Sequence, residues 1–203
     1  FFFFFSPETI LSTFRRHEVT HIFAVPLLWH TIEKKVLNNA EEQGKLDKLN
    51  KGIELCTKLQ NVFPYFGSFL AKKIMSSVTD EIFGDSIQFL ISGGSFIKQS
   101  TLRLFNGIGY PLHNGYGMSE IGIASVELRD KPKHRNLGTI GVPFRSAEYK
   151  IADDGSLLVK GNSVCTRRII KGEEIITDGW FDTGDIVERD EDGHYYIIGR
   201  KSD

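Results

Sequence analysis

Apolar side chains in the first half of the chain recur partly at helical spacing and partly in short β-rich runs. Residues 20–25 (Thr-His-Ile-Phe-Ala-Val) form one such run before Pro26, and residues 86–92 form another before the glycine pair Gly93-Gly94. Both runs predict buried strands, because they are short, apolar and bounded by chain-breaking residues. Strands that alternate with helices predict an α/β fold with a mainly parallel sheet flanked by helices.

Helices are predicted between and around these strands. The first begins at Ser6-Pro7-Glu8, where serine can accept free backbone N–H groups, proline suits the first turn, and glutamate complements the positive helix end. Apolar residues recur every four positions from Leu70 to Ile82 and predict one helix there. The predicted ranges are helices over about 27–39, 45–60, 69–83 and 98–106, and a short strand at 110–113.

The pattern changes near Gly138, after which we find no helical spacing. Short alternating strands follow, separated by Asp-Gly pairs at Asp154-Gly155, Asp178-Gly179 and Asp192-Gly193. Asp-Gly supplies the positive φ that tight hairpins need. We therefore predict an α/β subdomain over residues 1–137 and a small antiparallel, barrel-like β subdomain over residues 138–203.

The composition is that of an ordinary globular protein, with 40% hydrophobic and 25% charged residues. The net charge of −1 gives no basic excess, which argues against nucleic acid as a partner. No run of about 18 apolar residues occurs, so no transmembrane segment is expected, and peripheral membrane association stays open. Cys56 and Cys165 have neither metal-ligand nor disulfide-framework spacing and are expected to be reduced thiols in a cytoplasmic protein.

The strongest chemical signal is the segment Asn114-Gly115-Tyr116-Gly117-Met118-Ser119-Glu120. Two glycines around a tyrosine allow a close backbone approach, and a hydroxyl and a carboxylate follow directly. Tyr116 could stack on a planar base, Ser119 could donate to a phosphate, and Glu120 could hold a hard cation such as Mg²⁺. The residues alone leave a second interpretation open, in which Gly-Tyr-Gly is a turn with a packed aromatic ring and Ser-Glu starts a helix.

This segment resembles the Tyr-Gly-x-Thr-Glu motif of the adenylate-forming superfamily, with Ser119 in place of the usual threonine. The superfamily includes acyl-CoA synthetases, luciferases and peptide-synthetase adenylation domains. The resemblance implies that Tyr116 stacks on adenine, that Asn114 lies near the adenine amino edge, and that Ser119 touches the α-phosphate. It also implies that Glu120 binds Mg²⁺.

Three further segments resemble motifs of the family, and together with the tyrosine motif they occur in the family's usual order along the chain. Ser92-Gly93-Gly94-Ser95 resembles the glycine pair that borders the adenine and acyl pockets, and Trp180–Asp185 resembles the Tyr/Trp-x-x-Thr-Gly-Asp motif. There Asp185 is expected to accept hydrogen bonds from both ribose hydroxyls, because a carboxylate offers two acceptor oxygens. Gly199–Asp203 resembles the hinge motif Gly-Arg-x-x-Asp, which makes Arg200 a ribose contact and Asp203 the pivot. Taken singly, the last two motifs also fit a capped turn and a solvated tail.

The acyl pocket is assigned by the same resemblance. Its expected lining residues are Val25, Trp29, Met118 and Ile121, although plain core packing fits Trp29 and Ile121 as well. Small and apolar residues, with no aspartate to hold an amino group, favour a fatty or other apolar acid. The six histidines show no metal-ligand spacing and are expected to be structural or exposed, with His113 nearest the site.

The resemblance implies an ATP-dependent ligase that forms an acyl-adenylate and then an acyl-CoA thioester, most like long-chain fatty acid–CoA ligases. The expected cofactors and substrates are ATP, Mg²⁺, coenzyme A and a carboxylic acid. The family's phosphate loop and its adenylation lysine have no counterpart here, so we expect the chain to be a fragment of the large N-terminal domain that is inactive alone. Two alternatives remain: a ligase or adenylation domain that loads a carrier protein, and a non-catalytic nucleotide-binding module.

Overall fold

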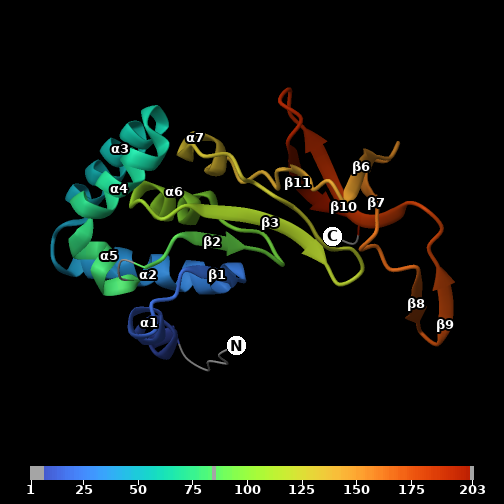
Figure 1. Ribbon diagram of the computed structural model, residues 1–203, viewed down its shortest axis with the longest axis horizontal. Helices are drawn as coiled ribbons and strands as arrows, with labels where there is room; N and C mark the ends of the chain where they lie inside the picture. Colours follow the sequence, from blue (N-terminus) through green and yellow to red (C-terminus); the bar gives the residue numbers. More distant parts are fainter. Residues whose placement is uncertain (1–6, 84–85, 202–203) are drawn as a thin grey trace. The chain divides into compact units, whose positions relative to one another are not determined.

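The computed structural model describes residues 7–83 and 86–201, and their placement along the chain is shown in Figure 1. These residues divide into two compact units. The first contains the described residues up to His113 together with Leu128–Gly138, and the second contains Asn114–Glu127 and the described residues from Thr139 onwards. The chain passes between units near the expected position, residue 138, but the segment 114–127 that we placed in the first part clusters with the second unit.

The first unit gathers helices around two parallel strands (Figure 1). Strands β1 (His21–Ala24) and β2 (Phe89–Ser92) pair with His21 opposite Phe89. The helices are α1 (Pro7–Arg16), α2 (Pro26–Glu42), α3 (Leu46–Val62), α4 (Pro64–Ile74), α5 (Ser76–Ile82), α6 (Gln99–Gly107) and α7 (Pro132–Arg135). None of the described helices is long and apolar enough to cross a membrane.

Most helices fall where the apolar spacing predicts them, and one prediction is wrong. The single helix expected over 69–83 is two helices, α4 and α5, which meet at Met75. Its start also lies earlier, at Pro64, because proline suits the first turn of a helix and has no N–H to satisfy there. The N-cap serine expected at Ser6 lies outside the described residues.

An aromatic cluster forms the centre of the first unit. The ring of Trp29 in α2 meets Phe105 in α6 edge-on, with 5.5 Å between ring centroids. Phe83 lies against both Phe105 and Tyr110, at 5.8 Å and 4.9 Å. All four side chains are almost completely buried. Each such ring contributes about 1.5–3 kcal/mol through burial, so this cluster stabilises the packing of α2 against α6.

Strand β3 (Leu112–Met118) begins in the first unit and continues into the second. The strand order of its sheet is β1-β2-β3-β4-β5, with β4 at Gly122–Val126 and β5 at Val142–Pro143. Both β3–β4 and β4–β5 pair antiparallel, so the sheet is mixed. The strand expected at 110–113 thus extends through the tyrosine motif, which forms neither a turn at Gly-Tyr-Gly nor a helix start at Ser-Glu.

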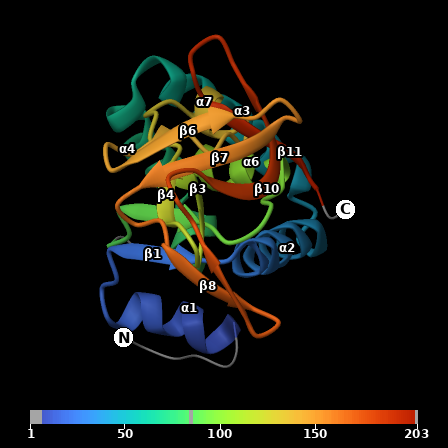
Figure 2. The same ribbon diagram turned by 90° about the vertical axis from the view of Figure 1, so that its right-hand side faces the viewer.

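The second unit is built from antiparallel strands, as expected. Its larger sheet has the order β11-β10-β7-β6, and Figure 2 shows β6, β7 and β10 side by side. The strands are β6 (Ala147–Ile151), β7 (Ser156–Gly161), β10 (Phe181–Arg189) and β11 (Tyr195–Arg200), with a separate pair β8 (Arg167–Ile170) and β9 (Glu173–Ile176). Buried apolar residues on alternate positions of β7 and β10, such as Leu157, Val159 and Phe181, form its core.

Two of the three Asp-Gly pairs form hairpins. Asp154-Gly155 joins β6 to β7, and Asp192-Gly193 joins β10 to β11. Asp178-Gly179 instead connects β9 to β10, which belong to different sheets. The β8–β9 hairpin turns at Lys171-Gly172, where φ is 51° and 85°. The expected fold class, a helix-flanked sheet followed by a small antiparallel β subdomain, is confirmed.

Candidate functional site

A buried tyrosine and a buried aspartate from two strands are joined by a short hydrogen bond. The Tyr116 hydroxyl in β3 donates to Oδ2 of Asp185 in β10 over 2.6 Å. Only 7% of Tyr116 and 6% of Asp185 is exposed. Burial, together with the hydrogen bond to the Asp185 carboxylate, raises the pKa of Tyr116 well above its usual range. The phenol therefore stays protonated and holds one oxygen of this carboxylate in place.

Arg200 lies on the other side of the same carboxylate. It is paired with Asp185 in the β10–β11 ladder, and its Nη1 atom lies 3.7 Å from Asp185 Oδ1. The Arg200 side chain is 53% exposed, whereas that of Asp185 is 8% exposed. A guanidinium has five N–H donors, so most of them remain available to a further acceptor. Tyr116, Asp185 and Arg200, which are far apart in sequence, thus form one cluster.

A bulge in β10 places Asp185 in this cluster. Opposite β7, Asp182 pairs with Leu158 and Ile186 with Ser156, so β10 carries extra residues between them. Within the bulge, Gly184 has φ of 74°, a conformation that side chains other than glycine rarely adopt. The Thr183 hydroxyl donates to the Leu157 carbonyl and accepts the Asp185 N–H. Bulges redirect side chains at functional sites, and here the Thr-Gly-Asp sequence supplies the residues that the bend needs.

The rest of the tyrosine motif is tightly packed in the second unit. Asn114 is buried, and its side-chain amide donates to the Thr139 carbonyl over 3.2 Å. The Thr139 hydroxyl donates in turn to the buried carboxylate of Glu127. A Cβ atom on Gly117 would lie 2.3 Å from the Gly122 carbonyl oxygen, so only glycine fits between β3 and β4. Gly115 pairs with Val126 across these strands.

Ser119 and Glu120 differ from these residues, because their side chains are not engaged. They lie in the turn between β3 and β4, Ser119 exposed and Glu120 half-buried. Across the described chain, neither side chain has a hydrogen-bond or ion-pair partner, while the Glu120 carbonyl accepts the Cys165 N–H over 2.7 Å. A free carboxylate suits a hard cation such as Mg²⁺, which keeps several water and phosphate ligands. Residues 7–83 and 86–201 contain no group of three metal-ligating side chains, and cation binding by Glu120 stays a prediction.

The glycine pair follows β2 in the first unit. The Gly93 N–H donates to the Ala24 carbonyl at the end of β1, and Gly94 has φ of 91°. Gly94 and Ser95 are exposed. Directly before them, the hydroxyl of fully buried Ser92 has no hydrogen-bond partner among the described residues. The positive φ explains the need for glycine at position 94, and the proposed contact with a nucleotide stays a prediction.

The four residues expected to line an acyl pocket have different environments. Val25 is 55% exposed, whereas Trp29 and Ile121 are fully buried. The Trp29 indole N–H donates to the Ala24 carbonyl over 3.3 Å, as in a core side chain. Met118 packs at the edge of the second unit's core. A groove of about 1040 Å³ elsewhere in the first unit, among α2, α3 and α5, contains none of the four. The lining assignment therefore stays a prediction.

A model of the family described as AMP-binding enzyme matches residues 2–167. The chain belongs to the AMP-binding enzyme family. That match contains the glycine pair and the tyrosine motif, and it ends before Asp185 and Arg200. The last two residues are therefore assigned by their motifs and by the cluster they form with Tyr116.

Relatives with known names include ligases for different acids. The chain is 37% identical to the long-chain-fatty-acid–CoA ligase FadD15 of Mycobacterium bovis, over 91% of this chain and 32% of that protein. It is 33% identical to the 2-succinylbenzoate–CoA ligase of Listeria monocytogenes, over 58% of this chain and 26% of that protein. The chain thus spans no more than about a third of the length of these relatives.

The fold is also found in solved structures. The O-succinylbenzoate coenzyme A synthetase from Bacillus subtilis, in complex with ATP and magnesium ion, matches with a TM-score of 0.62 and 22% identity. The match covers 98% of this chain and 35% of that structure. At 22% identity, this structural similarity is evidence for the fold of the chain alone.

Several residues that contact the neighbourhood of this cluster were missed by the sequence motifs. Glu127 and Thr139 form a buried pair behind Asn114, and neither residue belongs to a motif described above. The available signal was a glutamate directly after the mostly apolar strand β4, because glutamate is rarely buried unless it is paired. Lys201, which contacts Asp154 and Asp182, looked like part of a solvated tail. No local pattern predicts partners that are 47 and 19 positions away. Asp203, the expected hinge, lies outside the described residues.

Proposed function

We propose that this chain carries the nucleoside-binding part of an ATP-dependent carboxylic acid–CoA ligase. The observation that carries this proposal is the cluster of Tyr116, Asp185 and Arg200, which joins three family motifs through contacts that sequence alone could not give. Membership of the AMP-binding family and the named CoA ligases among its relatives support the same function.

In this proposal Asp185 binds the ribose. Each carboxylate oxygen can accept more than one hydrogen bond, so Oδ2 can hold the Tyr116 hydroxyl and a ribose hydroxyl together. Arg200 donates toward the same sugar from its exposed position. Because the Tyr116–Asp185 contact is already made, the carboxylate is oriented before ATP arrives, which reduces the ordering cost of binding. Tyr116 and Asn114 are assigned to the adenine, with Gly93, Gly94 and Ser95 at its border.

The proposed chemistry occurs at the α-phosphate. A carboxylate oxygen of the acid attacks the α-phosphorus, the bond to the β-phosphate oxygen breaks, and pyrophosphate leaves with the bonding electron pair. The Ser119 hydroxyl donates to an α-phosphate oxygen as charge develops there. Glu120 would hold Mg²⁺, whose positive charge offsets that of the phosphates when bound. Coenzyme A thiolate then attacks the acyl carbon and AMP leaves.

The acid is proposed to be a long-chain fatty acid. The highest identity among the relatives described above is to a long-chain-fatty-acid–CoA ligase, over 91% of this chain. Apolar Val25, Trp29, Met118 and Ile121 are the proposed pocket residues. The resemblance to 2-succinylbenzoate ligases covers a shorter part of the chain and makes an aromatic acid the competing substrate.

The test is acid-dependent exchange of labelled pyrophosphate into ATP by a full-length protein that contains this chain. The panel runs from acetate to palmitate and includes 2-succinylbenzoate, and coenzyme A is then compared with a carrier-protein pantetheine as acceptor. Exchange that peaks with palmitate is the expected result. Exchange only with short or aromatic acids would contradict the substrate, and ATP binding without any exchange would favour a non-catalytic nucleotide-binding module.

A further inference from the structure

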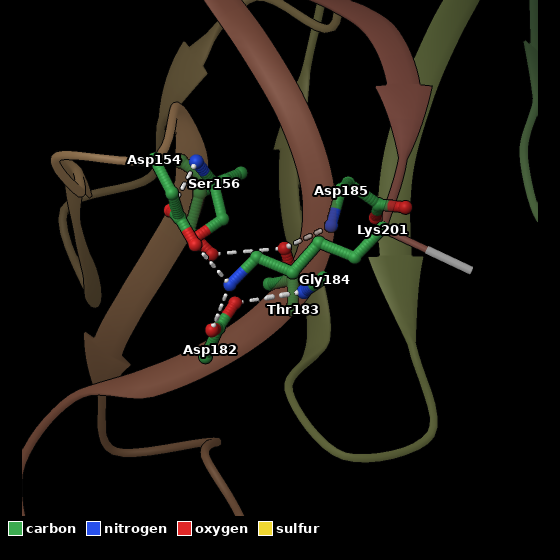
Figure 3. Close-up of polar contacts among 8 residues, drawn as sticks. Asp154, Ser156, Asp182, Thr183, Gly184, Asp185 and Lys201 are labelled. Atoms are coloured by element: carbon green, nitrogen blue, oxygen red, sulfur yellow. Dashed lines mark hydrogen bonds and ion pairs between the residues drawn. The ribbon is translucent and has the colours of Figure 1, made fainter. Parts of the chain in front are cut away.

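Lys201 lies between two carboxylates at the end of β11 (Figure 3). Its Nζ atom is 2.7 Å from Asp154 Oδ2 and 2.6 Å from Asp182 Oδ2. Asp154 belongs to the β6–β7 hairpin turn and Asp182 to the start of β10, so one ammonium group joins three elements of the second unit. We call Lys201, Asp154 and Asp182 the lysine latch.

Both carboxylates of the latch are oriented by a second set of hydrogen bonds. Oδ1 of Asp154 accepts the N–H and the hydroxyl of Ser156, and Oδ1 of Asp182 accepts the Gly184 N–H over 2.9 Å. The other oxygen of each is left for Lys201. The Lys201 N–H also donates to the Gly184 carbonyl over 2.8 Å. The lysine is therefore held at its backbone and at its side chain, and both contacts reach the same bulge.

The latch is charged at neutral pH. Hydrogen bonds from Lys201 and from Ser156 lower the pKa of Asp154, and hydrogen bonds to Asp154 and Asp182 raise the pKa of Lys201. Burial opposes ionisation of Asp182, but its hydrogen bonds with Lys201 and Gly184 outweigh it and lower that pKa. The side chains are 37–57% exposed, and ion pairs this exposed contribute little to folding stability. Another role must explain why three elements converge on one lysine.

The position of the latch indicates that role. Lys201 directly follows Arg200, and Gly184 directly precedes Asp185. The latch therefore ties together the backbone next to each member of the Asp185–Arg200 pair, whose own contact is loose at 3.7 Å. We propose that Lys201 is a positioning residue that fixes Asp185 and Arg200 relative to each other, so that both meet the ribose hydroxyls of the nucleotide. This inference rests on the proposed nucleotide site.

The test measures how strongly each variant prefers ATP over 2′,3′-dideoxy-ATP, by calorimetry on the full-length protein. Lys201→Met is expected to weaken ATP binding about tenfold, and binding of the dideoxy nucleotide by less than about twofold, because only the ribose contacts are disturbed. Lys201→Arg can still bridge the two carboxylates and is expected to restore most of the preference. The matched control is Lys150→Met, since Lys150 is an exposed lysine of β6 with no ion pair among the described residues.

The remaining outcomes separate the latch from the site on which it rests. Suppose that Lys201→Met weakens binding of both nucleotides equally, or of neither, while Asp185→Asn abolishes the preference for ATP. The latch proposal is then wrong, and the proposed ribose site stands. If the unmodified protein binds ATP and the dideoxy nucleotide equally well, the proposed ribose site itself fails. Melting temperatures of all variants are recorded, and a loss of preference in a variant that melts with the unmodified protein supports the positioning role.

Discussion

Buried polar side chains have different kinds of hydrogen-bond partners in the two units. In the first unit the buried amide of Gln60 donates to the Asn106 and Gly107 carbonyls, and the Asn106 side-chain oxygen accepts from Arg135. That network connects α3, α6 and α7 and is directed inwards. In the second unit the buried pair of Tyr116 and Asp185 leads outwards, to half-exposed Arg200. Buried polar contacts thus support packing in one unit and, in our proposal, orient a nucleotide-binding surface in the other.

The largest expected effect breaks the packing of the first unit. Phe105→Ala removes a fully buried ring that touches Trp29 and Phe83, and it should lower the free energy of unfolding by about 3–5 kcal/mol. Urea unfolding followed by tryptophan fluorescence measures this change. Phe66→Ala is the control, because that ring is 62% exposed and its loss should cost less than about 0.5 kcal/mol. Equal losses in the two variants would mean that the aromatic cluster does not support this unit.

A catalytic effect without a stability effect is expected in the second unit. Glu120→Gln should reduce acid-dependent pyrophosphate exchange about a hundredfold, because the neutral amide is a poor Mg²⁺ ligand. The melting temperature should not change, since this carboxylate has no partner within the described chain. Glu148→Gln in β6, an exposed glutamate, should leave both quantities unaltered. Full exchange activity in Glu120→Gln would remove this residue from the proposed site.

Acid should weaken the ion pairs of the lysine latch. The pKa values of Asp154 and Asp182 lie below their ordinary value of 3.8, so their contribution is complete above that value and is lost as the pH falls through the lower folded values. The Lys201 pKa is raised from 10.5, so its contribution is lost only above that pH. The protection of the Lys201 amide against hydrogen exchange should stay constant from about pH 4 to 10, and it should decrease below about pH 4. A fall near pH 6 would contradict these assignments.

The last prediction concerns the rates at which the two cysteines, one in each unit, are chemically modified. Cys56 is fully buried in α3, and burial raises the pKa of its thiol, so little reactive thiolate forms there. Cys165 is only partly buried. Iodoacetamide should therefore modify Cys165 at least about tenfold faster than Cys56 in the native protein, as measured by peptide mass spectrometry. Modification at equal rates would show that the core of the first unit opens readily.

The sequence predicted the fold well where local periodicity and turn chemistry decide it. Helical spacing located α2, α3 and α6, and Asp-Gly located two hairpins. The break between α4 and α5 was missed because apolar positions continue at helical spacing through Met75, a residue that is itself buried. The Asp178-Gly179 pair separates two strands, as expected, but these belong to different sheets, because turn chemistry does not identify the partner of a strand.

The candidate site was predicted residue by residue, but its contacts were not. Motifs named Tyr116, Asp185 and Arg200 separately. The hydrogen bond between the first two joins strands of two different sheets, and the two residues are 69 positions apart. No motif predicts the lysine latch, because Asp182 and Lys201 occupy variable positions of their motifs. Asp154 stands in a hairpin turn, where aspartate is common for its own reasons. The nucleotide contacts of Gly93–Ser95 and the acyl contacts of Val25, Trp29, Met118 and Ile121 stay predictions.

The most direct test of the account is the affinity of the full-length protein for ATP before and after Asp185→Asn. Asparagine keeps the size of the side chain and can still accept the Tyr116 hydrogen bond, but it loses one acceptor oxygen and the charge facing Arg200. Calorimetry should show binding weakened tenfold or more, about 1.4 kcal/mol, while the exposed control Asp178→Asn binds normally. Unchanged affinity in Asp185→Asn would contradict the claim that this buried carboxylate binds the nucleotide.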